Sequence, residues 1–113
     1  MHELALAESI LNIARSEMEK ANASSIQELE LEIGKLAGVE YSSLDFALKV
    51  LTENSIFKNT NIVIHKPDGQ AVCSECKNTF ILESFIGQCP NCNSYHFTIS
   101  GGKELRVKSI VID

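Results

Sequence analysis

The chain has 113 residues, a formal net charge of −5 at pH 7, 44% hydrophobic residues and 22% charged residues. These values indicate an ordinary globular protein of one domain, or one small domain with a smaller appendage, and they exclude a disordered chain. No apolar run approaches the roughly 20 residues that cross a bilayer, and the N-terminus lacks the pattern of a signal peptide. An acidic chain has little attraction for phosphates. We therefore expect a cytoplasmic protein whose partners are neither nucleic acids nor membranes.

The first expected element is an amphipathic helix from residue 2 to about residue 22. Its apolar residues recur at spacings of three and four and form one stripe: Leu4, Ala7, Leu11, Ala14, Met18 and Ala21. Small and polar residues at 21–25 end this helix. The stripe is predicted to pack against the core of the protein.

A strand and a second helix are expected next. Leu29, Leu31 and Ile33 alternate with glutamates, which predicts a strand over residues 26–33 with one buried face. Ser42 is the expected N-cap of the second helix, because an acidic residue follows it three positions later. The apolar side of that helix carries Leu44, Ala47, Leu48 and Leu51.

The rest of the chain is expected to form strands. Residues 59–65 form the second strand, and the turn sequence Pro67-Asp68-Gly69 then marks a boundary before the cysteine-containing segment. That segment includes a hairpin through residues 79–86 and returns through residues 95–99. The last expected strand spans residues 104–112.

This order of elements predicts an α+β fold. We expect a small three-stranded mixed sheet with two helices on one face, plus an inserted zinc-ribbon-like β lobe. Residues 1–68 and 100–113 would form the α/β domain, and residues 69–99 the zinc-binding domain.

Four cysteines give the strongest signal in the sequence. They form two Cys-x2-Cys pairs separated by twelve residues: Cys73, Cys76, Cys89 and Cys92. In a reducing compartment such pairs are thiolate ligands more often than disulfides, and two of them complete a closed tetrahedral zinc site. An iron–sulfur cluster also uses four cysteines, whereas a thioredoxin-like redox pair needs a βαβ context that is absent here. The expected metal is a structural Zn(II).

The N-terminal Met1-His2-Glu3 offers a second metal site. The terminal amine, the backbone nitrogens of His2 and Glu3, and the His2 imidazole can together surround one ion. Square-planar nitrogen coordination suits Ni(II) or Cu(II). The simpler alternative is that His2 is an unordered terminal residue, as chain ends usually are.

The two ends together resemble the HypA/HybF family of hydrogenase maturation factors, which are nickel metallochaperones. The resemblance covers the whole chain and rests on seven segments: Met1-His2-Glu3-Leu4, Glu32-Ile33-Gly34-Lys35-Leu36, Val39-Glu40, Leu44-Asp45-Phe46-Ala47, Cys73-Ser74-Glu75-Cys76, Cys89-Pro90-Asn91-Cys92 and Ser100-Gly101-Gly102-Lys103-Glu104-Leu105. One position departs from the family pattern, because Asn93 stands where glycine usually follows the last cysteine. Asparagine tolerates a left-handed backbone, so we expect the turn to be kept.

The resemblance implies a function as well as a fold. It implies that Met1, His2 and Glu3 bind Ni(II) as transported cargo, and that the four cysteines hold structural zinc. It also implies that a GTPase partner helps to pass nickel to the precursor of the [NiFe]-hydrogenase large subunit, and in some members to urease maturation proteins.

Other residues and functions are less well supported by the sequence. Glu40 is a candidate for an additional oxygen ligand near the N-terminus, and His96 for a ligand on the zinc lobe, whereas His65 is expected to be solvated at a strand end. The alternative function is a zinc-ribbon adaptor that binds another protein through its acidic surface. An enzyme is not expected, because the sequence shows neither a nucleophile–base pair nor a phosphate-binding glycine loop.

Overall fold

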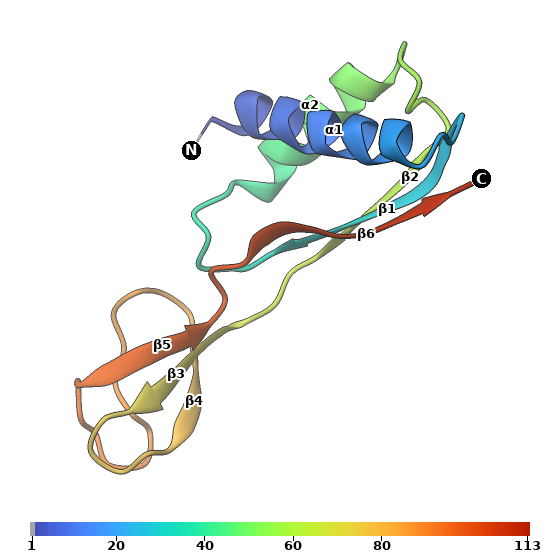
Figure 1. Ribbon diagram of the computed structural model, residues 1–113. Coiled ribbons are helices and arrows are strands. Elements are labelled where there is room, and N and C mark those ends of the chain that lie inside the picture. Colours follow the sequence, from blue (N-terminus) through green and yellow to red (C-terminus); the bar gives the residue numbers. More distant parts are fainter. Residues whose placement is uncertain (1) are drawn as a thin grey trace.

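The computed structural model describes residues 2–113, which form two lobes along one long axis (Figure 1). The larger lobe contains α1 (Glu3–Lys20), β1 (Ile26–Ile33), α2 (Tyr41–Thr52), β2 (Asn61–His65) and β6 (Leu105–Ile112). The smaller lobe contains β3 (Gly69–Cys73), β4 (Thr79–Leu82) and β5 (Phe97–Gly101). Its strands lie between β2 and β6 in the sequence, so the smaller lobe is inserted as predicted. No helix among residues 2–113 is long and apolar enough to cross a membrane.

The larger lobe is a three-stranded mixed sheet with both helices on one face (Figure 1). Its strand order is β2-β1-β6, in which β1 is parallel to β2 and antiparallel to β6. Leu29 lies opposite Ile62 and Leu31 opposite Ile64, so the apolar sides of the two strands face the helices together. This arrangement confirms the predicted fold class.

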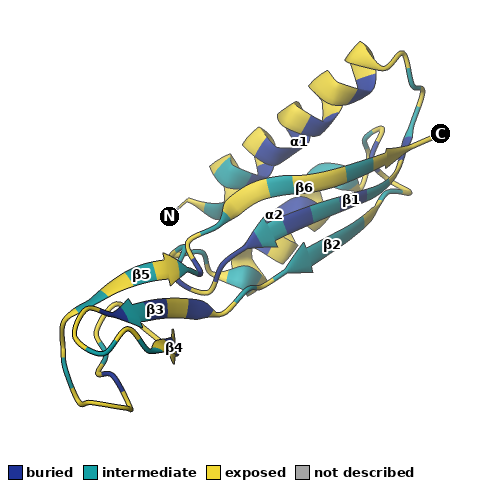
Figure 2. Cartoon of the chain, turned by 60° about the horizontal axis from the view of Figure 1, so that its bottom comes forward, coloured by how far each residue is buried: buried dark blue, intermediate teal, exposed yellow. Residues whose placement is uncertain are grey.

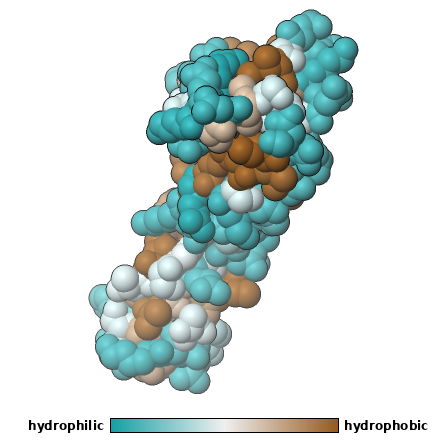
Figure 3. Space-filling view, turned by 45° about the vertical axis from the view of Figure 1, so that its right-hand side comes forward, coloured by the Kyte–Doolittle hydropathy of each residue, from teal (hydrophilic) through white to brown (hydrophobic). Residues whose placement is uncertain are grey.

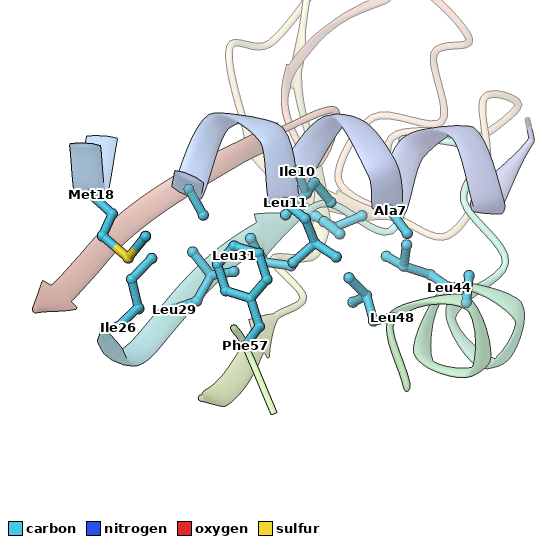
Figure 4. Close-up of a cluster of buried hydrophobic side chains, with 13 residues drawn as sticks. Ala7, Ile10, Leu11, Met18, Ile26, Leu29, Leu31, Leu44, Leu48 and Phe57 are labelled. Carbon is cyan, nitrogen blue, oxygen red and sulfur yellow. The ribbon is translucent and has the colours of Figure 1, made fainter. Parts of the chain in front are cut away.

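The core of the larger lobe lies between the helices and the sheet (Figure 4). Helix α1 contributes Ala7, Ile10, Leu11, Ala14 and Met18. The predicted stripe is therefore right in its middle and wrong at its ends, because Leu4 is 54% exposed and Ala21 is exposed. Leu4 lines an open hollow beside α2, and Ala21 lines an open hollow beside β6, so neither position is covered.

The start of α2 corrects the predicted N-cap. The cap is Glu40, whose carboxylate accepts hydrogen bonds from the Ser42 backbone N–H at 3.4 Å and from the Ser42 hydroxyl at 2.9 Å. Since the Ser42 hydroxyl is a donor to Glu40, it does not serve as the acceptor that an N-cap requires. The helix consequently begins one residue before Ser42, at Tyr41.

The two lobes join where backbone segments lie in direct contact. Gly34 at the end of β1 packs so closely on Gly102 that a Cβ atom on Gly34 would overlap the Gly102 carbonyl group. The Gly102 carbonyl accepts a hydrogen bond from the Leu36 N–H at 2.7 Å, and Gly34 donates to the Glu104 carbonyl at 2.8 Å. The Leu36 side chain is buried in the core of the smaller lobe. The loop after β1 thus supplies part of the smaller lobe's core.

Candidate metal centres

The four cysteines lie on two loops of the smaller lobe that have the same backbone conformation. In the first loop Cys73 ends β3, and its carbonyl accepts a hydrogen bond from Lys77 N–H at 3.0 Å. In the second loop the Cys89 carbonyl accepts from Asn93 N–H at 2.8 Å. Lys77 and Asn93 both have a left-handed backbone, with φ of 66° and 64°. The expectation that Asn93 keeps the family's turn is confirmed.

This pairing of loops brings four sulfur atoms together. All four Sγ atoms lie within 4.8 Å of one another. The Cys73 and Cys92 sulfurs are 3.5 Å apart, and those of Cys76 and Cys89 are 3.7 Å apart. A tetrahedral zinc ion with Zn–S bonds of about 2.3 Å requires sulfur separations of about 3.8 Å. The cluster therefore has the size and donor set of a closed, structural metal site.

The pKa shifts of three of the four thiols also favour a bound cation. The Asn91 side-chain amide donates to the Cys76 sulfur at 3.4 Å and lowers the pKa of that thiol to about 6. The backbone N–H of Cys76 lowers the pKa of Cys73 in the same way. The Ser94 N–H favours the Cys92 thiolate, but the neighbouring cysteine sulfurs outweigh it and raise the pKa of Cys92 to about 12. Because four crowded thiols do not all ionise on their own, a divalent ion would complete their deprotonation.

The predicted nickel residues lie at the start of α1, in the larger lobe. His2 is the N-cap of α1, has an extended backbone and is exposed, and its carbonyl accepts from the Leu6 N–H at 3.0 Å. Glu3 begins the helix. Met1, the third predicted ligand residue, lies outside the described residues. Within residues 2–113, the four cysteines are the one group of His, Cys, Asp and Glu side chains close enough to hold a metal, so a nickel site here would depend on backbone nitrogens.

Glu40 lies beside the N-terminal end of the chain, where an additional nickel ligand would have to lie. Its backbone N–H donates to the Glu3 carboxylate at 3.2 Å. This hydrogen bond is the main cause that lowers the pKa of Glu3 from its ordinary 4.5. The carboxylate of Glu40 is itself bonded to Ser42. The contact ties the first turn of α1 to the start of α2.

The Glu3 contact predicts an acid-dependent contribution to stability. Because the folded-state pKa of Glu3 is lowered, its contribution is present above pH 4.5 and is lost as the pH falls through the folded-state pKa. We expect Glu3→Gln to cause a modest loss of stability at pH 7 that diminishes as the pH falls below 4.5, measured by urea denaturation from pH 7 to pH 3. Glu8→Gln on the same helix is the control. A Glu3→Gln effect of equal size at pH 7 and pH 3 would contradict the prediction.

Neither of the other two histidines belongs to the four-sulfur cluster. His65 ends β2, and its Nε2 is 3.6 Å from the Glu30 carboxylate across the sheet. His96 is an exposed residue of the smaller lobe, where its carbonyl accepts from the Ser74 N–H at 2.9 Å. The four sulfurs form their cluster without either imidazole.

Sequence reasoning missed an apolar surface next to His2. A hollow of about 420 Å³ is lined in part by His2, Leu4, Phe46 and Val50. Leu4, Phe46 and Val50 are 54%, 69% and 51% exposed. The sequence did hold a sign of this surface. Phe46 and Val50 are four residues apart on α2 and lie outside the apolar side formed by Leu44, Ala47 and Leu48.

These features define a class of protein before any relative is considered. It is a small two-lobed α+β protein with one closed four-cysteine metal site, which leaves no coordination position open for catalysis. A family model described as "Hydrogenase/urease nickel incorporation, metallochaperone, hypA" matches residues 1–112. The chain therefore belongs to the HypA family, whose members are nickel metallochaperones of hydrogenase maturation and not enzymes.

Individual relatives agree with this assignment over the full length. The hydrogenase maturation factor HypA of Parabacteroides distasonis is 44% identical over 112 residues, which cover 99% of this chain and 97% of that protein. The HypA of Chlorobium luteolum is 34% identical over 113 residues, covering 100% and 97%. The solution structure of the Ni metallochaperone HypA from Helicobacter pylori superposes with a TM-score of 0.67 at 24% identity, covering 99% of this chain and 97% of that one. The last comparison shows that the fold is shared.

Proposed function

We propose that this metallochaperone binds Ni(II) at its free N-terminus. The ligands would be the terminal amine of Met1, the backbone nitrogens of His2 and Glu3, and the His2 imidazole. The observation that carries the proposal is the position of His2, which is exposed at the start of α1 and makes no capping hydrogen bond with its side chain. The bond from Glu40 to Glu3 supports it by anchoring the adjacent turn. The Glu40 carboxylate is bonded to Ser42 and is not among the proposed ligands.

The four cysteines are proposed to bind Zn(II) with a structural role. The sulfur separations of 3.5 Å and 3.7 Å, close to those around zinc, and the all-sulfur donor set favour a tetrahedral d10 ion. In this proposal residues 69–99 form the zinc-binding domain, and residues 1–68 with 100–113 form the nickel-binding domain.

Delivery would involve other proteins of the maturation pathway. We propose that a GTPase partner and the precursor of the [NiFe]-hydrogenase large subunit act with this chain, with urease maturation proteins as further partners. Membership of a family described by nickel incorporation into hydrogenase and urease supports this part of the proposal.

Blocking the N-terminus tests the nickel site. We expect an N-terminal extension, or His2→Ala, to weaken Ni(II) binding by about 100-fold, equivalent to about 2.7 kcal/mol, while the zinc content stays unchanged. The reason is that the extension removes the amine and the substitution removes the imidazole, each of which closes a chelate ring. Absorption spectroscopy during nickel titration of the untagged protein measures the loss of the planar nickel complex.

His65→Ala is the matched control, because it removes a histidine from β2 instead of from the N-terminus. It is expected to bind nickel like the wild-type protein. Equal nickel binding by the extended form would show that the terminal chelate is wrong and would favour the adaptor function. Nickel affinity should also fall as the pH is lowered, because the imidazole and amide nitrogens must be free of protons to bind the ion.

A further inference from the structure

A second apolar surface lies between α1 and the edge strand β6, which we call the α1/β6 groove. It consists of two adjoining hollows of about 410 Å³ and about 150 Å³ that share Ile13 and Val107. Its apolar lining includes Leu6, Ile13, Leu105, Val107, Ile110 and Ile112. Ile13 is 50% exposed and Ile112 is 37% exposed. The face of the larger lobe in Figure 3 also shows apolar residues gathered into a continuous patch.

The floor of the groove is a strand with one unpaired edge. Within the described residues β6 pairs only with β1, so its other edge presents backbone N–H and C=O groups to the groove. Figure 2 shows that β6 is exposed along most of its length. Helix α1 overhangs this edge without covering it. An added strand would pair with the backbone and also place every second side chain beneath α1, whereas a helix would leave the strand edge unpaired.

The charges on the strand side of the groove indicate the chemistry of the occupant. Arg106 and Lys108 are exposed, and Lys108 lines the larger hollow without an ion pair among the described residues. Arg106 Nε is 2.7 Å from the Glu32 carboxylate. The strand side of the groove is therefore basic although the chain as a whole carries a charge of −5, while on the helix side Glu17 is paired with Lys20 at 3.6 Å. Acidic side chains on a docked segment would be attracted to the strand side.

A second copy of the chain fits this edge poorly. Two β6 strands paired with each other would collect two arginines and two lysines along one short ladder. The acids nearest to this strand are already engaged: Glu32 with Arg106, Glu30 with the Ser109 hydroxyl, and Asp113 with Ser24 and the Ser25 N–H. Lys108 is also the extra residue of a bulge between the pairs Glu30–Ser109 and Leu31–Val107. Because the bulge leaves Lys108 unpaired with β1, its charge at this edge would repel an identical basic strand and attract an acidic one.

We infer that the α1/β6 groove binds an extended segment of another protein as a fourth strand of the sheet, with alternating apolar and acidic side chains. The apolar side chains enter the space beneath α1 and the acidic ones face Lys108 and Arg106. One end of the groove reaches Leu6, whose N–H is bonded to the His2 carbonyl. A bound segment consequently ends near the N-terminus. The inference concerns docking alone and does not depend on nickel coordination.

A synthetic peptide tests this site. The probe is a capped nonapeptide of alternating glutamate and isoleucine, added to the isotope-labelled full-length protein and followed by amide NMR shifts. We expect the shifts to concentrate on residues 105–112 and on Ile13. Lys108→Glu should weaken binding about fivefold through charge reversal, and Ile13→Ser about tenfold through lost apolar burial. Shifts elsewhere, or none at millimolar peptide, would overturn the inference.

Matched controls separate the parts of the inference. Ile81→Ser makes the same substitution at a residue that is 63% exposed on β4, so it should bind the peptide normally. A peptide with N-methylated amides on its pairing edge should not bind, and equal binding would overturn the added strand. Equal binding of a lysine–isoleucine peptide would overturn the acidic preference.

Sedimentation tests whether a second copy of the chain is the occupant. If the wild-type protein self-associates and Ile13→Ser abolishes this self-association, the proposed partner is overturned. Nickel affinity should be the same in all these variants, so failure here is distinct from failure of the N-terminal chelate.

Discussion

Cys76→Ser is expected to release the structural metal and to unfold the smaller lobe, while the larger lobe stays folded. The buried core of the smaller lobe consists of only six residues: Leu36, Ala71, Cys73, Phe80, Leu82 and Cys89. Two of them, Cys73 and Cys89, belong to the four-sulfur cluster. For sites of this kind the binding free energy of the metal is largely folding free energy, on the order of 10 kcal/mol. A lobe with so small a core has no comparable source of stability without the ion.

The larger lobe should survive this substitution because its core is separate. Within residues 2–113, its 13 buried residues come from α1, β1, α2 and the loop after α2, and none comes from β3, β4 or β5 (Figure 4). Zinc content would be measured by atomic absorption, and the folding of each lobe by amide hydrogen exchange. We expect zinc to be lost and protection to vanish over residues 69–101, with protection retained in α1 and β1.

Ser74→Ala provides the control for this experiment. Ser74 lies between the two cysteines of the first pair, is exposed, and contributes its backbone N–H to the His96 carbonyl, which alanine keeps. It should retain zinc and a protected lobe. A protected, zinc-loaded lobe in Cys76→Ser would contradict the four-sulfur assignment, and unfolding of both lobes would contradict the division into two domains.

The second large effect is expected at the junction of the lobes. Gly34→Ala would place a methyl group onto the Gly102 carbonyl, and the neighbouring atoms there are backbone that cannot turn aside like a side chain. The Gly34 and Leu36 hydrogen bonds across the junction would have to lengthen. We expect a loss of about 3 kcal/mol in the free energy of unfolding, at the upper end of typical overpacking costs. Urea denaturation of the zinc-loaded protein measures it.

Gly101→Ala is the matched control, one residue from the contact. A Cβ atom on Gly101 would lie 3.7 Å from the nearest atom, which is ordinary van der Waals contact. Its effect should stay within about 0.5 kcal/mol, as for most surface substitutions. If Gly34→Ala were equally mild, the close packing of the two lobes at this point would not hold in solution.

Patterns that depend on neighbours along the chain were predictable from the sequence. The two cysteine pairs, the strand Ile26–Ile33 and the mixed sheet with an inserted lobe were all predicted, and the structure has them. Periodicity and spacing are local properties, so they can be recognised without knowing the rest of the fold. The N-terminal Met1-His2-Glu3 by itself indicated a site for Ni(II) or Cu(II), and the family resemblance favoured nickel over the alternative of an unordered terminus.

Features that depend on what packs against a residue were decided by the tertiary structure alone. Leu4 continues the apolar stripe of α1 but is 54% exposed, in an open hollow that it lines with Phe46 and Val50 of α2. Glu40 caps α2 in place of Ser42, since the chain brings it to both Ser42 and Glu3. Leu36 belongs in sequence to the larger lobe and in space to the core of the smaller one. The sequence by itself determined which metal-binding groups and elements exist. The packing determined which apolar residues are left uncovered, because burial depends on distant segments that meet only in the folded chain.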